Sequence, residues 1–281
     1  MNRWVALLII SLSVLFALSL WFSATAVIPQ LVTKWQLNDQ QSASVTTAVQ
    51  LGFIIGALFL TSTSLPDRIN GRYLFAFCAS VGALSNFLFT LSPVFEVGLL
   101  LRFVTGATLV GVYPTAVQLV SLWFVTRKGT AVGIIIGALT IGSALPHLIK
   151  AFASDLQWQI VIYASSCLAL FASIIILFLL PDVLTTQKKQ TIKGNTLLNV
   201  LRNRRVMLAN YGYFGHMWEL YAMWTWLPLF LTTSFQQGAH SPIFVQLAPI
   251  FAFCIIGIAG AIGAICGGLL ADKIGKARLA K

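Results

Sequence analysis

Four ionisable side chains lie inside long apolar stretches of this sequence, namely Arg102, His147, His216 and Glu219. His216 and Glu219 are three residues apart, so on a helix they share one face. A carboxylate beside an imidazole in a medium of low dielectric constant can exchange a proton readily, which suits proton-coupled chemistry. We therefore predict a proton-coupling role for His216 and Glu219. The alternative is a structural hydrogen bond between them or to neighbouring helices.

Arg102 suits a different task, because a guanidinium stays charged under physiological conditions and offers a planar fork of donors. It can bind an anion, or repel a proton from a nearby acid, if its side chain faces a cavity. A long side chain near the end of a membrane span could instead reach the lipid headgroups. Further candidate cavity residues follow it in the sequence, and the predicted substrate-binding set is Arg102, Tyr113, Gln118 and Trp218.

The composition shows which solvent surrounds these groups. Hydrophobic residues make up 58% of the 281 residues, charged residues make up 9%, and the mean hydropathy is +0.88. A soluble domain of this length would carry about a quarter charged residues, so the lipid bilayer must be the partner that buries this apolar surface. The net charge of +11 falls in short basic clusters between apolar runs, which indicates membrane topology and not a nucleic-acid partner.

No pattern in the sequence is typical of an enzyme or a cofactor site. The four cysteines, Cys78, Cys167, Cys254 and Cys266, lie inside apolar runs and lack the spacing of metal ligands. Neither a nucleophile with an adjacent base nor a nucleotide-binding loop is present in the sequence. We expect no enzyme activity, no metal, no disulfide and no cofactor.

Each membrane span needs about 20 mostly apolar residues in a helix, because only a helix satisfies its own backbone amides in lipid. Eight segments meet this requirement, which predicts an all-α integral membrane protein. The first is too long for a cleaved signal peptide, the competing interpretation of the amino terminus. The predicted spans are approximately Trp4 to Ile28, Ala43 to Thr63, Tyr73 to Leu91, Val97 to Phe124, Thr130 to Ile149, Trp158 to Leu180, Val206 to Thr232 and Ile243 to Leu270.

The lysines and arginines divide 15 to 2 between the two sides of these spans, with Arg102 alone inside a span. The poorer side has only Lys34 and Lys150. Basic loops stay in the cytoplasm, so both termini are predicted to be cytoplasmic, as an even number of spans also requires. We expect a multi-pass protein of a cell membrane, the bacterial inner membrane.

The longest polar stretch divides the chain into six spans and two. We predict an N-terminal six-helix bundle over residues 1–181, a basic cytoplasmic linker over 182–205, and the first two helices of an incomplete second bundle over 206–281. The linker is either a solvated connection near anionic headgroups or a joint between two pseudo-equivalent halves. The second interpretation requires an internal repeat.

Such a repeat is present. After the second span the sequence reads Leu65-Pro-Asp-Arg-Ile-Asn-Gly-Arg72, and after the eighth it reads Leu270-Ala-Asp-Lys-Ile-Gly-Lys276. Both copies have the order Leu-x-Asp-basic-Ile, and their aspartates are 205 residues apart. Asp can accept backbone hydrogen bonds at a helix end, and Gly permits a turn with positive φ. The repeat predicts paired gating loops, with candidate residues Asp67, Arg68, Gly71, Arg72, Gly268, Asp272, Lys273 and Gly275.

This pattern resembles the Gly-x-x-x-Asp-Arg/Lys-x-Gly-Arg/Lys signature of the major facilitator superfamily, found after helices two and eight. The second copy fits, whereas the first has Thr63 in place of the leading Gly, and its Gly71 comes one residue late. Arg102 and Gly106 are similar to the family's Arg-x-x-x-Gly element in the fourth helix. Gly133, Gly137, Gly142 and Pro146 are loosely similar to its Gly/Pro-rich fifth helix.

The resemblance implies secondary active transport of a small-molecule substrate by alternating access. Arg102 favours an organic or inorganic anion, and His216 with Glu219 favours proton coupling. Eight Trp and twenty Phe support a drug or metabolite exporter as the alternative. The family fold has twelve helices, so we expect either a truncated chain, a separate partner chain that supplies the remaining helices, or a remnant that does not transport.

Reporter fusions test the predicted topology. Fusions after Asp182 and at Lys281 should be cytoplasmic, and fusions near Gln36 and Gln237 should be periplasmic, because basic loops stay inside. Alkaline phosphatase and green fluorescent protein report the two sides. A periplasmic location for Lys281 would contradict the eight-span arrangement.

Overall fold

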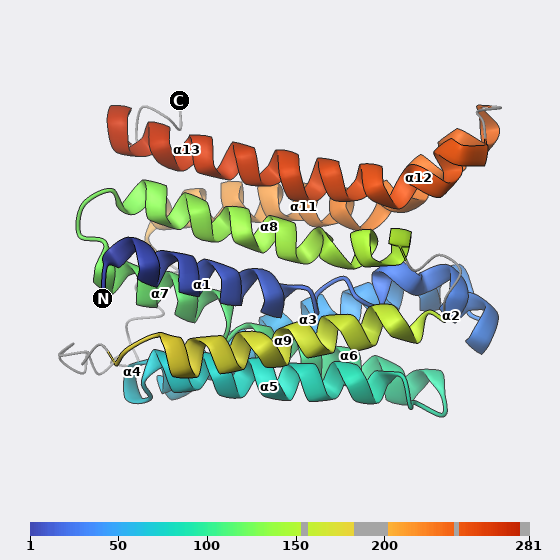
Figure 1. Cartoon of the computed structure of the whole chain (residues 1–281), viewed down its shortest axis with the longest axis horizontal. Coiled ribbons are helices and arrows are strands. Elements are labelled where there is room, and N and C mark those ends of the chain that lie inside the picture. The colour runs from blue at the N-terminus through green and yellow to red at the C-terminus, as the bar shows by residue number, and fades with distance from the viewer. Residues whose placement is uncertain (153–156, 183–201, 239–241, 276–281) are drawn as a thin grey trace.

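The computed structural model describes residues 1–152, 157–182, 202–238 and 242–275, and these ranges form a bundle of helices with no strand among them. Neighbouring helices in the bundle run lengthwise beside one another (Figure 1). The helices and helical turns are α1 (Arg3–Leu18), η1 (Thr25–Val27), α2 (Ile28–Trp35), α3 (Asp39–Thr63), α4 (Leu65–Arg68), α5 (Gly71–Phe89), α6 (Phe95–Leu109), α7 (Tyr113–Trp123), α8 (Lys128–Phe152), α9 (Gln159–Leu179), α11 (Arg204–Gln237), α12 (Pro242–Phe253), η2 (Cys254–Ala259) and α13 (Gly260–Ile274).

The predicted membrane fold is confirmed, because six helical stretches are long and apolar enough to cross a bilayer. They correspond to the second to sixth and the eighth of the predicted spans. The first predicted span contains α1, an apolar helix of 16 residues. The seventh contains α11, which has 34 residues and is not among the six stretches. The full count of eight spans stays a prediction.

Two predicted spans are interrupted near their middle. The first loses helical structure after α1 and continues as η1 and α2, and the fourth is divided into α6 and α7 around Gly111. The second interruption has a visible cause, because Pro114 lies in the first turn of α7 and provides no backbone donor. The first has neither Gly nor Pro between Leu18 and Ala24, so other parts of the molecule must support it.

The two ends of the bundle differ in the helices and loops that lie there. The amino terminus, α4, the start of α8 and the end of α13 lie at one end, and α2 lies at the other (Figure 1). We name them the loop-motif end and the α2 end. The first helix and the last described helix therefore place their outer ends on one side, as an even number of crossings requires. Which side faces the cytoplasm stays a prediction.

Glycines allow α3 and α6 to approach until their backbones touch. A Cβ atom on Gly106 of α6 would contact the carbonyl oxygen of Val49 in α3, and one on Gly52 would contact the carbonyl oxygen of Phe103. Small residues support helix association in membranes because they permit this close packing. The glycine of the Arg-x-x-x-Gly element thus has a structural task one turn from Arg102.

We expect Gly106→Ala to lower the thermal unfolding temperature, because the new methyl group must push α3 and α6 apart at a cost of about 1–3 kcal/mol. Gly263→Ala is the matched control, since a Cβ atom there would meet nothing within 4 Å. Melting curves of the purified variants in one detergent test this. Equal melting temperatures for the two variants would contradict the close packing.

Candidate functional site

Arg102 is fully buried among the first six predicted spans, with 0% of its surface exposed. One guanidinium nitrogen donates to Asn86 Oδ1 at 2.7 Å and to Ser23 Oγ at 3.2 Å. The other donates to the carbonyl oxygens of Leu20 at 3.0 Å and Trp21 at 2.8 Å. The side chain therefore lies inside the protein and does not extend to the lipid headgroups.

The charge of Arg102 is hydrogen-bonded but not neutralised. Its partners are neutral oxygens, its Nε atom has no partner, and it forms no ion pair with any residue that the structure describes. An ion moved from water into a protein interior loses several kcal/mol of solvation. Neutral oxygens replace part of that solvation, and the positive charge remains available to attract an anion.

Asn86 connects Arg102 to three other helical segments. Its side-chain oxygen accepts from Arg102 and from Ser23 Oγ at 2.8 Å, and its amide donates to Ser166 Oγ at 2.9 Å and to the carbonyl oxygen of Ile162 at 3.2 Å. All four side chains in this network are buried. One polar network therefore joins the first, third, fourth and sixth predicted spans.

The interruption after α1 carries two large aromatic side chains to α11. Trp21 stacks on Tyr221, with ring centroids 5.4 Å apart and an interplanar angle of 10°, and Phe22 lies edge-on to Trp224 at 6.1 Å. Trp21 also packs against Phe53 of α3 at 5.0 Å. Arg102 holds the backbone of Trp21, so it also fixes this contact between the first six spans and α11.

The predicted substrate-binding residues do not gather in one place. Tyr113 begins α7 and is half-buried against the core, whereas Gln118 of the same helix is exposed. Trp218 of α11 is 82% exposed. Arg102 is the only member of the set that is fully enclosed.

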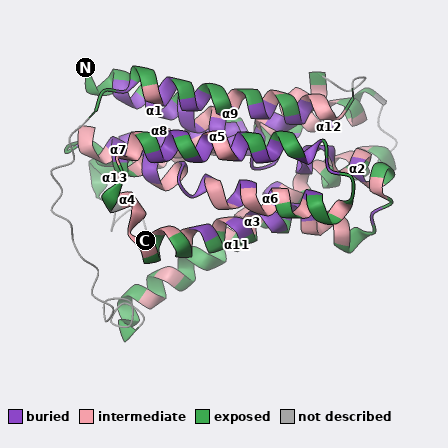
Figure 2. Cartoon of the chain, turned by 90° about the horizontal axis from the view of Figure 1, so that it is seen from below, coloured by how far each residue is buried: buried purple, intermediate pink, exposed green. Residues whose placement is uncertain are grey.

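The predicted proton-coupling residues lie on an open face of α11. His216 and Glu219 are both exposed, and neither forms a hydrogen bond or ion pair with a described residue or with the other. Figure 2 shows α11 largely in the colours of exposed and intermediate residues. The proposed link between Arg102 and Glu219 therefore has no contact in this arrangement of the helices.

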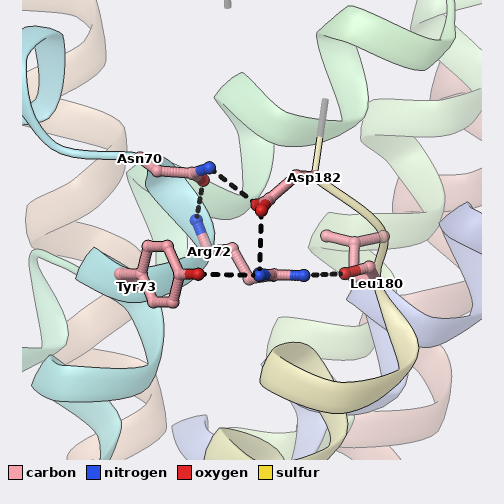
Figure 3. Close-up of polar contacts among 5 residues, drawn as sticks. All are labelled: Asn70, Arg72, Tyr73, Leu180 and Asp182. Atoms are coloured by element: carbon pink, nitrogen blue, oxygen red, sulfur yellow. Dashed lines mark hydrogen bonds and ion pairs between the residues drawn. The ribbon is translucent and has the colours of Figure 1, made fainter. Parts of the chain in front are cut away.

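The first loop of the repeat is fastened to the end of α9. Arg72 forms an ion pair of 3.1 Å with Asp182 and donates to the carbonyl oxygen of Leu180 at 2.7 Å, and Asn70 donates to Asp182 at 2.8 Å (Figure 3). The Tyr73 hydroxyl accepts a further bond from Arg72 at 3.0 Å. The basic residue of the motif thus ties the loop to the residue where the predicted linker begins.

The structure describes fewer contacts for the other residues of the first loop. Arg68 is exposed, and the side chain of Asp67 lies outside the described part of the structure. Gly71 starts α5 without a positive φ angle, which differs from the expected tight turn. Its missing side chain makes room for α7, because a Cβ atom would approach Thr115 and Leu119 to 3.1 Å.

The second loop joins the end of α13 to the start of α8. Asp272 accepts hydrogen bonds from the backbone amides of Gly129 at 2.8 Å and Thr130 at 2.7 Å, and from the Thr130 hydroxyl at 2.7 Å. A helix leaves its first amides unpaired and has a partial positive charge there, so a carboxylate from another helix can cap it. Asp272 therefore connects the two predicted halves at the loop-motif end.

Small residues allow this connection. A Cβ atom on Gly133 of α8 would lie 2.6 Å from the carbonyl oxygen of Ala264, and one on Gly268 would contact the carbonyl oxygen of Gly129. The leading Gly of the motif thus permits α13 to touch α8. Lys273 is exposed, and Gly275 has a φ of 86°, a positive value that glycine adopts readily.

The sequence did not indicate several of these contacts. Asn86 and Ser23 belong to no motif that predicts this network. Trp21 and Tyr221 are two of many aromatic residues in the sequence. A polar residue inside an apolar segment is a usable signal, because Asn86 must find hydrogen-bond partners there.

The sequence profile of the major facilitator superfamily matches residues 9–281. The chain belongs to this family. Two curated relatives agree with the assignment. A probable sulfoacetate transporter, SauU of Cupriavidus necator, is 28% identical over an alignment of 204 residues, and the match covers 64% of this chain and 46% of the relative. The MFS-type transporter pytF of Aspergillus terreus is 29% identical over an alignment of 170 residues, and the match covers 58% of this chain and 53% of the relative. The chain spans about half the length of the curated relatives that it matches.

Removal of the Asp272 carboxylate should loosen the start of α8. We expect hydrogen exchange at Gly129 and Thr130 to accelerate by about 5- to 30-fold in Asp272→Ala, because a lost helix cap costs about 1–2 kcal/mol. Asp39→Ala, which removes a carboxylate from the first turn of α3, is the control. Unchanged exchange at these two amides would show that Asp272 does not cap α8.

Proposed function

We propose that this chain takes part in secondary active transport of a small organic anion by alternating access. Membership of a transporter family supports the reaction class, and the buried, un-neutralised guanidinium of Arg102 supports the charge of the substrate. A positive charge attracts an anion about 6 Å away by roughly 3 kcal/mol at an effective dielectric constant of about 20. Arg102 can therefore favour an anion although its hydrogen bonds are all to groups of the protein.

The substrate would pass close to Trp21, where the positive charge of Arg102 attracts an anion. The Arg102 guanidinium holds the Trp21 carbonyl, and the Trp21 ring packs on Tyr221 of α11. Interrupted helices commonly line transporter substrate sites near the middle of the bilayer. We propose that an anion binds beside this interruption and that Tyr113, Gln118 and Trp218 contribute after the halves move.

The Asp272 contact supports alternating access. It joins α13 to α8 at one end of the bundle, so passage at the loop-motif end requires it to break. The Arg72 and Asp182 ion pair lies within the first six spans and can move with them as a unit. We propose that in this cycle the Asp272 loop holds α13 and α8 together until its hydrogen bonds break. The first loop of the repeat stays attached to α9 throughout.

We propose that Glu219 and His216 carry the coupled proton, and that helices from the remainder of the transporter cover their open face. These helices belong either to a longer form of this chain or to a separate partner chain. The multi-pass membrane location follows from the family and the six apolar helical stretches. The bacterial inner membrane is our proposal for the specific membrane.

One observation favours a second function, export of an aromatic or apolar compound. Trp21, Phe53, Tyr221 and Trp224 pack together between the first spans and α11. A set of aromatic rings of this size binds apolar ligands well. Competition between an organic sulfonate and a neutral aromatic compound distinguishes the two functions.

Binding and uptake in proteoliposomes test the proposed anion transport. The chain, supplemented with the helices that complete the family fold, should accumulate an organic sulfonate or carboxylate such as sulfoacetate under a pH gradient. Arg102→Ala should weaken binding by about 100-fold, because roughly 3 kcal/mol of attraction is lost. Arg102→Lys should restore it only partly, since the donor fork is absent.

Arg205→Ala is the control for the loss of an arginine, because Arg205 is exposed and lies outside both loops of the repeat. Melting curves must show that each variant is folded. Glu219→Gln should abolish accumulation driven by the proton gradient and spare substrate exchange. Unchanged anion binding in folded Arg102→Ala would contradict the anion proposal, and unchanged accumulation in Glu219→Gln would remove the proton site.

A further inference from the structure

A second positively charged group lies apart from Arg102, at the α2 end of the bundle. Lys150 is in the last turn of α8, and its ammonium group donates to the side-chain oxygen of Gln30 in α2 at 2.8 Å. Lys150 is half-buried against the first span and forms no ion pair with a described residue. An ammonium group has three donors, so two remain beyond the bond to Gln30.

His147 lies one turn before Lys150 on the same face of α8. It is only 2% exposed, and its Nε2 atom has no hydrogen-bond partner. Residues three apart on a helix place their side chains next to each other. A buried ring nitrogen without a partner has lost its hydrogen bond to water, so a ligand that supplies a partner is favoured there.

Among the residues that the structure describes, no acidic side chain forms an ion pair with Lys150. Lys150 is the charged group that acts electrostatically on His147. Asp39 and Glu96 lie in the first turns of α3 and α6 and form no ion pair with Lys150. Gln30 adds an amide that can both accept and donate.

We infer that Gln30, His147 and Lys150 form an anion-binding site at the α2 end of the bundle, which takes a carboxylate or sulfonate group. The Lys150 ammonium and the His147 Nε2–H donate to the oxygens of the anion. The Gln30 oxygen holds Lys150 in place. This inference rests on the proposed transport of an organic anion and assigns the site where the anion first meets the protein.

A lipid phosphate offers the same chemistry as a soluble sulfonate, so the test must separate the two sources. Only three histidines occur in the chain, which makes selective NMR of their imidazoles practical. The purified chain, labelled at histidine, is titrated with pH in a phosphate-free maltoside detergent. His147→Asn identifies the His147 signals.

Methanesulfonate should raise the pH at which His147 titrates by about one unit, because a bound anion stabilises the imidazolium. The uncharged analogue dimethyl sulfone should have no effect. Lys150→Gln should abolish the shift caused by methanesulfonate. Lys34→Gln, which removes the other lysine predicted on this side, should leave it intact.

Three results would overturn the site: no shift with methanesulfonate, the same shift in Lys150→Gln, or a shift that appears only in nanodiscs containing phosphatidylglycerol. The last result would assign the chemistry to a lipid headgroup. The titration needs no transport, so its outcome is independent of the uptake assay. A sulfonate-dependent shift without uptake would leave the site in place and contradict only the proposed transport.

Discussion

The burial of one guanidinium group constrains most of the helices described here. Arg102 has no surface in contact with solvent and no carboxylate beside it among the described residues, so neutral groups must replace its hydration. Two backbone carbonyls do so, those of Leu20 and Trp21, and both lie in the interruption that follows α1. The buried charge of Arg102 and the interruption of the first span therefore stabilise each other.

This mutual dependence extends across the bundle. Asn86 orients toward Arg102 and reaches the sixth predicted span through Ser166. The interruption turns Trp21 toward α11, so a polar network inside the first six spans sets the aromatic contact with the seventh. A substrate anion that disturbs the field of Arg102 would act on both. Such a coupling between the binding region and the contact between halves is what alternating access requires.

Part of this arrangement could be predicted from the sequence. Long apolar runs indicated the helices because a backbone in lipid must form its own hydrogen bonds. The equivalence of the loops that contain Asp67 and Asp272 stays a prediction. Pro114 is the sequence feature that accompanies the division of the fourth span. The interruption near Trp21 could not be predicted, since no Gly or Pro precedes it and its support comes from Arg102, 81 residues away.

The site residues were harder to predict for a related reason. Arg102 was recognised by its charge, but two of its four hydrogen-bond partners are backbone oxygens, which every residue has. The exposure of Glu219 and His216 depends on which helices cover α11, a property of the neighbouring chain segments and not of the residues themselves. The Asp272 cap on α8 required the close approach that Gly268 and Gly133 permit, and only the folded chain shows it.

The position of the Arg102 guanidinium can be measured directly by solid-state NMR in lipid bilayers. With ¹⁵N in the arginine guanidinium groups and ¹³C in the tryptophan carbonyls, rotational-echo dephasing should show a pair less than about 4 Å apart, because the nitrogen lies 2.8 Å from the Trp21 oxygen. That pair should vanish in Arg102→Lys. Dephasing of the Arg102 guanidinium by lipid ³¹P, with no contact to Trp21, would place the charge at the headgroups and contradict the account.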